Sequence, residues 1–160
     1  MSQCDIPPSV LFKMGDKINE LSPDAIFWTG DITPHDMWNQ SVDHVIRYSD
    51  YLTNYLNGNL ADWATYVIDG NHDFGELINS MDFREGNRDP IIDHQAITWK
   101  QWFTEESMAE FVQNGFYSQR FKTSDGRVHE KVRVIAINTE ACYYYNLYLL
   151  AEMSDPGNQL

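Results

Sequence analysis

Basic residues are scarce in this 160-residue chain. Lys and Arg together number 11 against 24 Asp and Glu, which gives a formal net charge of −13. Because affinity for nucleic acid depends largely on neutralising backbone phosphates, we expect no nucleic-acid partner. The acidic excess would suit divalent cations, but dispersed surface carboxylates are the simpler explanation. The charge balance therefore argues against a nucleic-acid-binding protein but does not indicate which other function the chain has.

Long apolar runs are missing as well. No run approaches the ~20 residues that a helix needs to cross a bilayer. The first residues, Met1–Asp5, contain no basic segment followed by an apolar one, so the sequence predicts no signal peptide and no transmembrane segment. Hydrophobic residues still make up 42% and aromatic residues 14% of the chain. This composition is typical of one domain with a packed core.

The first half of the chain has a strand–helix–strand pattern. We expect a helix up to residue 22 with Ser9 as its cap, and then a buried strand over residues 24–29. A second helix should begin after a cap at Ser41 and end at Asn57–Asn59, and a second strand should follow over residues 65–68. This order predicts a right-handed βαβ unit whose two loops lie side by side at the carboxyl ends of the strands.

The second half is expected to alternate as well. Residues 74–90 are weakly patterned and predict a long loop, and residues 91–111 predict one helix with Trp99, Trp102 and Phe103 on its apolar side. The last elements are strands over residues 115–121 and 132–137, with turn chemistry at residues 124–127 between them. The fold class is therefore α/β.

Two short motifs follow the two strands of the first half. Thr29-Gly30-Asp31 precedes His35-Asp36, and Gly70-Asn71-His72-Asp73 follows the second strand. An aspartate and an asparagine supply hard oxygen ligands, and a histidine beside them could reach a substrate, so the pair predicts part of a two-metal hydrolase site. Each motif alone is also compatible with a simple turn.

These motifs resemble those of the calcineurin-like metallophosphoesterases, and within them the acid sphingomyelinase group. The resemblance implies that this α/β chain is a fragment of a β-sandwich flanked by helices. It also implies that Asp31 bridges two Zn²⁺ ions and that Asn71 binds the second of them. His72 would contact the scissile phosphate and help to protonate the leaving group, and His35 would lie beside the phosphate. The residues that carry the resemblance are Cys4–Pro7, Trp28–Ile32, His35–Trp38, Gly70–Asp73, Gly115–Tyr117, Ile137–Thr139, Cys142 and Asp155–Leu160.

The resemblance implies a zinc-dependent phosphodiesterase that hydrolyses a phospholipid head group, converting sphingomyelin to ceramide and phosphocholine. The parent family is extracellular or lysosomal. Two alternatives stay open: a related enzyme acting on nucleotides or polyphosphate, and a noncatalytic secreted binding protein on the same scaffold.

The chain also departs from the family pattern. The family's first metal motif, Asp-x-His, should precede Cys4, and its late histidine motifs should follow Leu160. Residues 1–160 are therefore expected to form a partial catalytic domain that is inactive alone. By the same resemblance, Cys4 and Cys142 should lack their partners. Asn39 begins a glycosylation sequon, and the aromatic segment Tyr143–Tyr145 could border a substrate cleft or simply pack.

Overall fold

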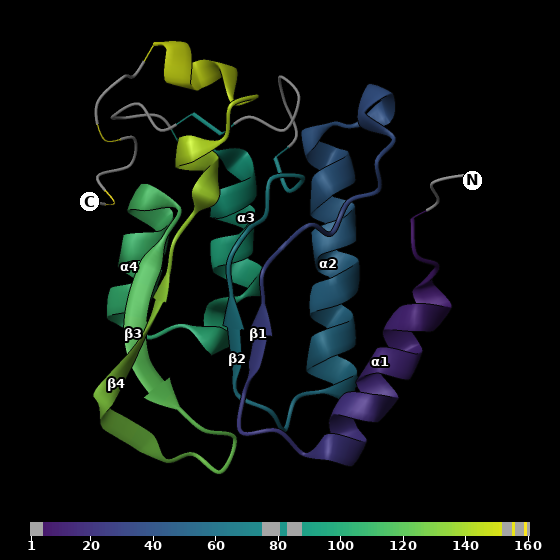
Figure 1. Ribbon diagram of the computed structural model, residues 1–160, viewed down its shortest axis with the longest axis vertical. Coiled ribbons are helices and arrows are strands. Elements are labelled where there is room, and N and C mark those ends of the chain that lie inside the picture. The colour runs from purple at the N-terminus through teal and green to yellow at the C-terminus, as the bar shows by residue number, and fades with distance from the viewer. Residues whose placement is uncertain (1–4, 75–80, 83–87, 152–154, 156–158, 160) are drawn as a thin grey trace.

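The computed structural model describes residues 5–74, 81–82, 88–151, 155 and 159. The helices are α1 (Pro8–Leu21), α2 (Val42–Asn59), α3 (Pro90–Thr98) and α4 (Glu105–Asn114). The strands are β1 (Ile26–Trp28), β2 (Thr65–Val67), β3 (Tyr117–Lys122) and β4 (Val128–Ala136). Short 3₁₀ helices are η1 (Met37–Asn39), η2 (Lys100–Trp102), η3 (Thr139–Cys142) and η4 (Leu147–Leu150). Figure 1 shows the arrangement.

The expected βαβ unit is present. Strands β1 and β2 pair in parallel, with Phe27 opposite Tyr66, and α2 connects them. The pairing continues past the strands, where Ile68 N donates to Trp28 O at 3.0 Å. Both strands therefore end at the same edge, and the loops that follow them lie together near η1 in Figure 1.

The second sheet is an antiparallel hairpin. Tyr117 of β3 pairs with Ala136 of β4, and a register shift occurs after Arg120. Strand β4 is longer than the sequence predicts because the turn is tight: Thr123 N donates to Arg127 O, so pairing resumes at Val128. The two sheets contact each other through aromatic rings, since Phe121 stacks on Tyr66 at a centroid distance of 5.8 Å. The predicted mixed α/β class is confirmed.

One boundary of the first two helices differs from the prediction. Helix α1 begins at Pro8 rather than after Ser9, so Ser9 is not its cap; Pro7 occupies that position without a side-chain bond. A proline at the first helical position already has the helical φ and lacks only an N–H that would be unpaired anyway. Helix α2 begins as expected, with the Ser41 side chain accepting from His44 N, and ends at Asn59, within the predicted Asn57–Asn59.

The prediction of a single helix over residues 91–111 is wrong. Helix α3 ends at Thr98, η2 follows, and α4 starts afresh behind the cap Thr104. Thr104 and Ser107 form a reciprocal capping box, which satisfies two backbone donors that a continuous helix would not leave open. Of the expected loop over residues 74–90, residues 74, 81–82 and 88–89 are described and lie outside regular structure, and Pro90 already begins α3. Residues 75–80 and 83–87 lie outside the described part.

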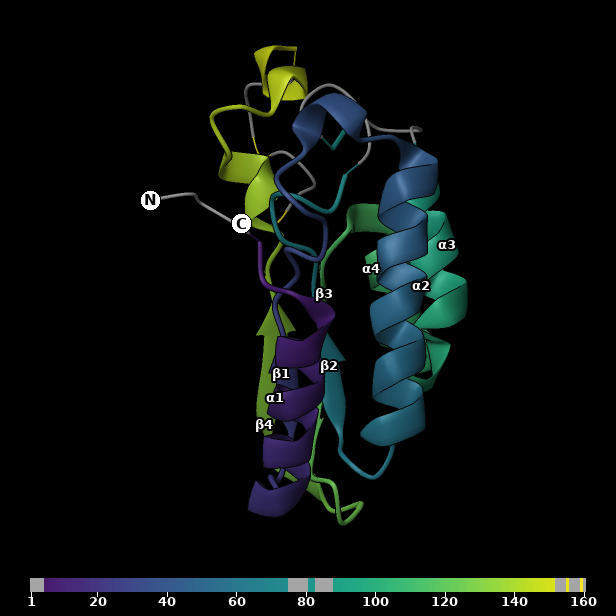
Figure 2. The same ribbon diagram turned by 90° about the vertical axis from the view of Figure 1, so that its right-hand side faces the viewer.

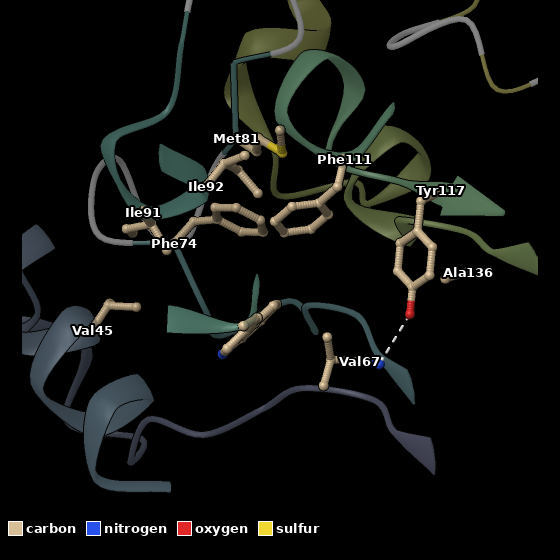
Figure 3. Close-up of a cluster of buried hydrophobic side chains, with 10 residues drawn as sticks. Val45, Val67, Phe74, Met81, Ile91, Ile92, Phe111, Tyr117 and Ala136 are labelled. Atoms are coloured by element: carbon tan, nitrogen blue, oxygen red, sulfur yellow. Dashed lines mark hydrogen bonds between the residues drawn. The ribbon is translucent and has the colours of Figure 1, made fainter. Parts of the chain in front are cut away.

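The core lies between the strands and one layer of helices. Helices α2, α3 and α4 lie on the same side of the strands in Figure 2. Tyr117 is 1% exposed and its hydroxyl accepts from Val67 N at 3.1 Å, which ties the hairpin to β2 (Figure 3). Phe74 is also fully buried and belongs to the same cluster of buried hydrophobic side chains as Tyr117 and Val67. Because Val67 and Phe74 bracket the loop after β2, the core fixes both ends of that loop.

Candidate active site

The two loops that follow β1 and β2 touch through glycines. Gly30 has φ +79°, and a Cβ added there would lie 1.8 Å from Gly70 N. A Cβ added at Gly70 would lie 2.4 Å from an Asp31 carboxylate oxygen. Asp31 itself has φ +59°, a conformation that Asp tolerates better than most residues. The absence of side chains at both glycines therefore permits the Asp31 carboxylate to lie against the second loop.

Asp73 fastens the two loops to each other. Its carboxylate is fully buried and accepts backbone N–H groups from Asp31 at 2.7 Å, Ile32 at 2.9 Å and Gly70 at 2.8 Å. Burial raises the pKa of Asp73 to about 6, although these three hydrogen bonds act in the opposite direction. Sequence reasoning assigned no role to Asp73, although it is the last residue of the Gly-Asn-His-Asp motif.

His72 and Asp31 meet at this edge. His72 N donates to Asp31 Oδ1 at 3.1 Å. The carbonyl group of His72 is fixed as well, because the Thr33 hydroxyl and Gln40 Nε2 both donate to His72 O. Asn71 lies directly between Gly70 and His72 and is half-buried. The structure thus places Asp31, Asn71 and His72 in two adjoining loops, as the motifs predict.

His35 joins the same group of side chains. Its ring centroid lies 4.6 Å from that of His72. Asp5 accepts from His35 N at 3.0 Å and contacts His35 Nδ1 at 2.6 Å, so this exposed ring is held in one orientation. The His35 side chain lowers the pKa of the Asp5 carboxyl. All four residues that the sequence predicts for the site are therefore near one another, while their catalytic and metal-binding roles stay predictions.

Two further buried acids escaped sequence reasoning. Asp69 is 3% exposed and accepts from Gln95 Nε2 at 2.6 Å, and burial together with the Asp73 charge raises its pKa well above the usual range. Glu140 is 1% exposed, and burial chiefly raises its pKa to about 8. The Asp31 and Asp73 charges add to this rise, while the backbone of Met81 opposes it. Asp69 directly precedes the Gly70–Asp73 motif and Glu140 directly follows the Ile137–Thr139 segment, but neither acid had a predicted role, because the sequence does not show that it is buried.

The donor atoms fit a divalent cation in part. Asp31 and Asn71 offer carboxylate and amide oxygens, which hard cations prefer. Within the described part of the chain, however, no group of three His, Cys, Asp or Glu side chains is arranged to hold a metal ion. The described residues thus supply a portion of a coordination sphere.

Other predictions concern residues away from this edge. Cys142 has an exposed free thiol, and Cys4 lies outside the described residues. Within the described ranges, no helix combines the length and apolarity needed for a membrane span. Tyr144 stacks on Tyr145 with centroids 3.9 Å apart and is 77% exposed, so these rings pack on one another at the surface.

Comparison with known proteins identifies the family. Residues 9–151 match the family model described as calcineurin-like phosphoesterase. The chain belongs to this family.

Several relatives are similar over nearly the whole chain. It is 35% identical to acid sphingomyelinase-like phosphodiesterase 3b of Mus musculus, covering 98% of this chain and 33% of the relative. It is 29% identical to sphingomyelin phosphodiesterase of Homo sapiens, covering 99% of this chain and 25% of the relative. It is also 29% identical to the human cyclic GMP-AMP phosphodiesterase, covering 98% of this chain and 33% of the relative. The chain thus spans about a quarter to a third of the length of these relatives.

Proposed function

We propose that this chain forms part of a zinc-dependent phosphodiesterase centre that hydrolyses a phospholipid head group. The observation that carries the proposal is the meeting of Asp31 with the Asn71-His72 loop, where His72 N donates to Asp31 Oδ1 at 3.1 Å. Membership of the calcineurin-like phosphoesterases supports the reaction type. The relatives named sphingomyelin phosphodiesterase support the substrate class.

Asp31 and Asn71 would hold the metal in this centre. Bound there, a divalent cation supplies Lewis-acid polarisation of a phosphoryl oxygen. Asp73 contributes by fixing the Asp31 backbone and Gly70 in one arrangement, so the two donor side chains need no reorganisation.

The histidines act on the phosphodiester itself. His72, beside Asp31, would help to protonate the leaving oxygen, and His35 would lie beside the phosphate; the nearness of the two rings supports these roles. Asp5 orients the His35 ring through two contacts. His35 is exposed, so a bulky substrate could reach it without displacing other side chains.

Product binding tests this assignment on the 160-residue chain. The chain is titrated with Zn²⁺ and then with phosphocholine, while the ring signals of all histidines are followed by NMR. We expect phosphocholine to shift the His35 and His72 signals only when Zn²⁺ is present. Asp31→Asn, which keeps an acceptor for His72 N and tolerates positive φ, should abolish the shifts. Asp16→Asn, an exposed acid on α1, is the matched control.

Two results of the titration would contradict the assignment. Shifts that persist in Asp31→Asn, or that occur at His94 or His129 instead, would contradict the assignment. We also expect no sustained turnover of sphingomyelin by this chain with Zn²⁺, because the described residues supply only part of a metal site. Sustained turnover that is lost in His72→Ala would show that the ligands in this chain suffice.

A nucleotide is the second candidate substrate. The human relative named cyclic GMP-AMP phosphodiesterase matches this chain at 29% identity, equal to human sphingomyelin phosphodiesterase. Repeating the titration with AMP separates the two: larger shifts at His35 and His72 with AMP than with phosphocholine would favour the nucleotide. With either substrate, we propose that the whole protein works outside the cell or in the lysosome, as the acid sphingomyelinase-like names of its relatives suggest.

A further inference from the structure

Glu140 is a buried carboxylate whose oxygens accept no hydrogen bond of ordinary geometry from the described residues, although the backbone of Met81 favours its charged form. Its side chain is 1% exposed, and neither Oε1 nor Oε2 makes a hydrogen bond of ordinary geometry to a described residue. The backbone around it is well fixed. Glu140 N donates to Asn138 Oδ1 at 3.0 Å, and Asn146 Nδ2 donates to Glu140 O at 3.1 Å. The fold therefore holds Glu140 in place while leaving its charged group unsatisfied.

The position of Glu140 links it to the candidate active site. It lies in η3, directly after β4, and β4 ends at the same end of the molecule as β1 and β2 (Figures 1 and 2). The charges of Asp31 and Asp73 both act on the Glu140 carboxyl, so this group lies within electrostatic reach of the two loops. Three segments distant in sequence thus carry carboxyl groups that lie within electrostatic reach of one another.

Such an arrangement is costly without a positive charge. A buried carboxylate costs several kcal/mol unless it is paired, and neighbouring carboxylates add repulsion. No Lys or Arg among the described residues forms an ion pair with Glu140. A bound divalent cation would remove both costs at once, because it compensates Asp31 and Glu140 together.

Direct coordination by all these acids is not what the geometry shows. The described residues contain no group of three His, Cys, Asp or Glu side chains within ligand distance of one point. Glu140 would then act at one remove, through a water molecule between its carboxylate and the cation. Carboxylates of this outer shell commonly orient the water and tune the affinity of a metal site.

We propose that Glu140 is an outer-shell partner of a divalent cation held by Asp31 and Asn71. The inference rests on the proposed function, since it requires a cation at Asp31. It adds a positioning residue from a third element of the fold. The same element explains why Asn138 and Asn146 are buried: their side chains fix the Glu140 backbone.

Binding of Mn²⁺ to the 160-residue chain tests the proposal. Mn²⁺ affinity is measured by counting free Mn²⁺ with electron paramagnetic resonance, and thermal unfolding is followed with and without Mn²⁺. We expect Glu140→Gln to weaken Mn²⁺ binding 10- to 100-fold, the usual effect of removing an outer-shell carboxylate. Without the cation and above pH 8, where Glu140 carries its charge, the same variant should be at least as stable as the unmodified chain, because an unpaired buried charge has been removed. Glu106→Gln, an exposed position on α4, is the matched control and should change neither quantity.

The outcomes separate this inference from the proposed function. A structural role for Glu140 would give the opposite pattern, with lower stability in Glu140→Gln and unchanged Mn²⁺ affinity, and would overturn the inference. If Asp31→Asn abolishes Mn²⁺ binding while Glu140→Gln leaves it intact, only the inference fails. If Asp31→Asn also leaves binding intact, or the unmodified chain binds no Mn²⁺, the proposed centre fails as well. Should Glu140→Gln fold poorly, Glu140→Met, which fills the volume without charge, should show the same loss of affinity.

Discussion

The loops after β1 and β2 differ sharply from the β3–β4 hairpin in the way they use charge. In the loops, Asp73 is fully buried and Asp31 has positive φ. In the hairpin, Arg120 pairs with Glu130 and Arg127 with Asp125, all exposed to solvent. Surface pairs of this kind contribute little to stability and impose no cost when broken.

This difference indicates that the hairpin serves mainly the stability of the fold, whereas the two loops serve the candidate active site. The hairpin follows ordinary rules of strand pairing, and its charges lie where water solvates them. The loops and the adjoining η3 carry carboxylates whose burial raises their pKa values, namely those of Asp73 and Glu140. Perturbed acids of this sort cluster at functional sites, because the protein retains them despite their cost. The same substitution should therefore have different effects in the two regions.

The largest difference is expected at two glycines of nearly equal backbone conformation. Gly30 has φ +79° and Gly126 has φ +85°, but only Gly30 has atoms close to the added Cβ, with Gly70 N at 1.8 Å. Gly126→Ala should cost about 1–2 kcal/mol from the backbone conformation alone. Gly30→Ala should cost more than about 4 kcal/mol or prevent folding, because the two loops must separate. Urea unfolding of both variants measures the difference; equal losses would show that the loops are not tightly packed.

The next effect concerns the hydrogen bonds that join the loops. Asp73→Asn replaces an acceptor by an NH₂ group that faces backbone N–H groups of Ile32 or of Asp31 and Gly70. Unpaired buried donors cost about 1–3 kcal/mol each, so we expect a loss of roughly 2–4 kcal/mol in the free energy of unfolding. Asp16→Asn on the exposed face of α1 should stay within about 0.5 kcal/mol. A loss at Asp73 no greater than at Asp16 would contradict the observed bonding.

A smaller effect should appear as pH dependence without added metal. The pKa values of Asp73 and Glu140 are raised in the folded state, from 3.8 to about 6 and from 4.5 to about 8. The folded state then binds more protons at these two groups than the unfolded state across these intervals. The stability that Asp73 and Glu140 contribute is therefore fully present in acid and is lost as pH rises through their folded pKa values.

The variant Glu140→Gln tests how much of the stability loss between pH 6 and pH 8 is due to Glu140. The unmodified chain in a chelating buffer should lose roughly 2 kcal/mol between pH 6 and pH 8, a value discounted from the full shift for solvent screening. Glu140→Gln should reduce that loss clearly, with the remainder due to Asp69, whose pKa is raised as well, and Glu106→Gln should leave the loss unchanged. Parallel declines in all three proteins, measured by urea unfolding at pH 6, 7 and 8, would show that Glu140 is not the group responsible.

Much of this fold could be predicted because its signals are local. The Ser41 cap, the apolar stripe of α2 and the short strands were each visible in a few consecutive residues, and they sufficed to place Asp31 and His72 in adjoining loops. The break between α3 and α4 was missed because Trp99, Trp102 and Phe103 continue a helical apolar pattern across it. The Thr104–Ser107 capping box was the signal that should have outweighed this pattern.

The site could be predicted only where it follows a motif. Asp31, His35, Asn71 and His72 stand in recognisable order after strands. Glu140 follows a strand as well, but its burial depends on Met81, which is far away in the sequence and whose carbonyl accepts from the same Asn146 side chain that donates to Glu140 O. Long-range packing of this kind leaves no periodic trace, so only the folded structure reveals the acid.

One NMR titration tests most directly whether the loops, rather than the acidic surface in general, bind a cation. Mn²⁺ is added in small steps to the ¹⁵N-labelled chain, and the broadening of each amide signal is recorded. We predict that Asp31, His72 and Glu140 broaden first, while Asp125 and Glu130 of the hairpin stay sharp although they are acidic and exposed. Earlier broadening at Asp125 or Glu130, or uniform broadening over the exposed acids of α1 and α2, would contradict the account.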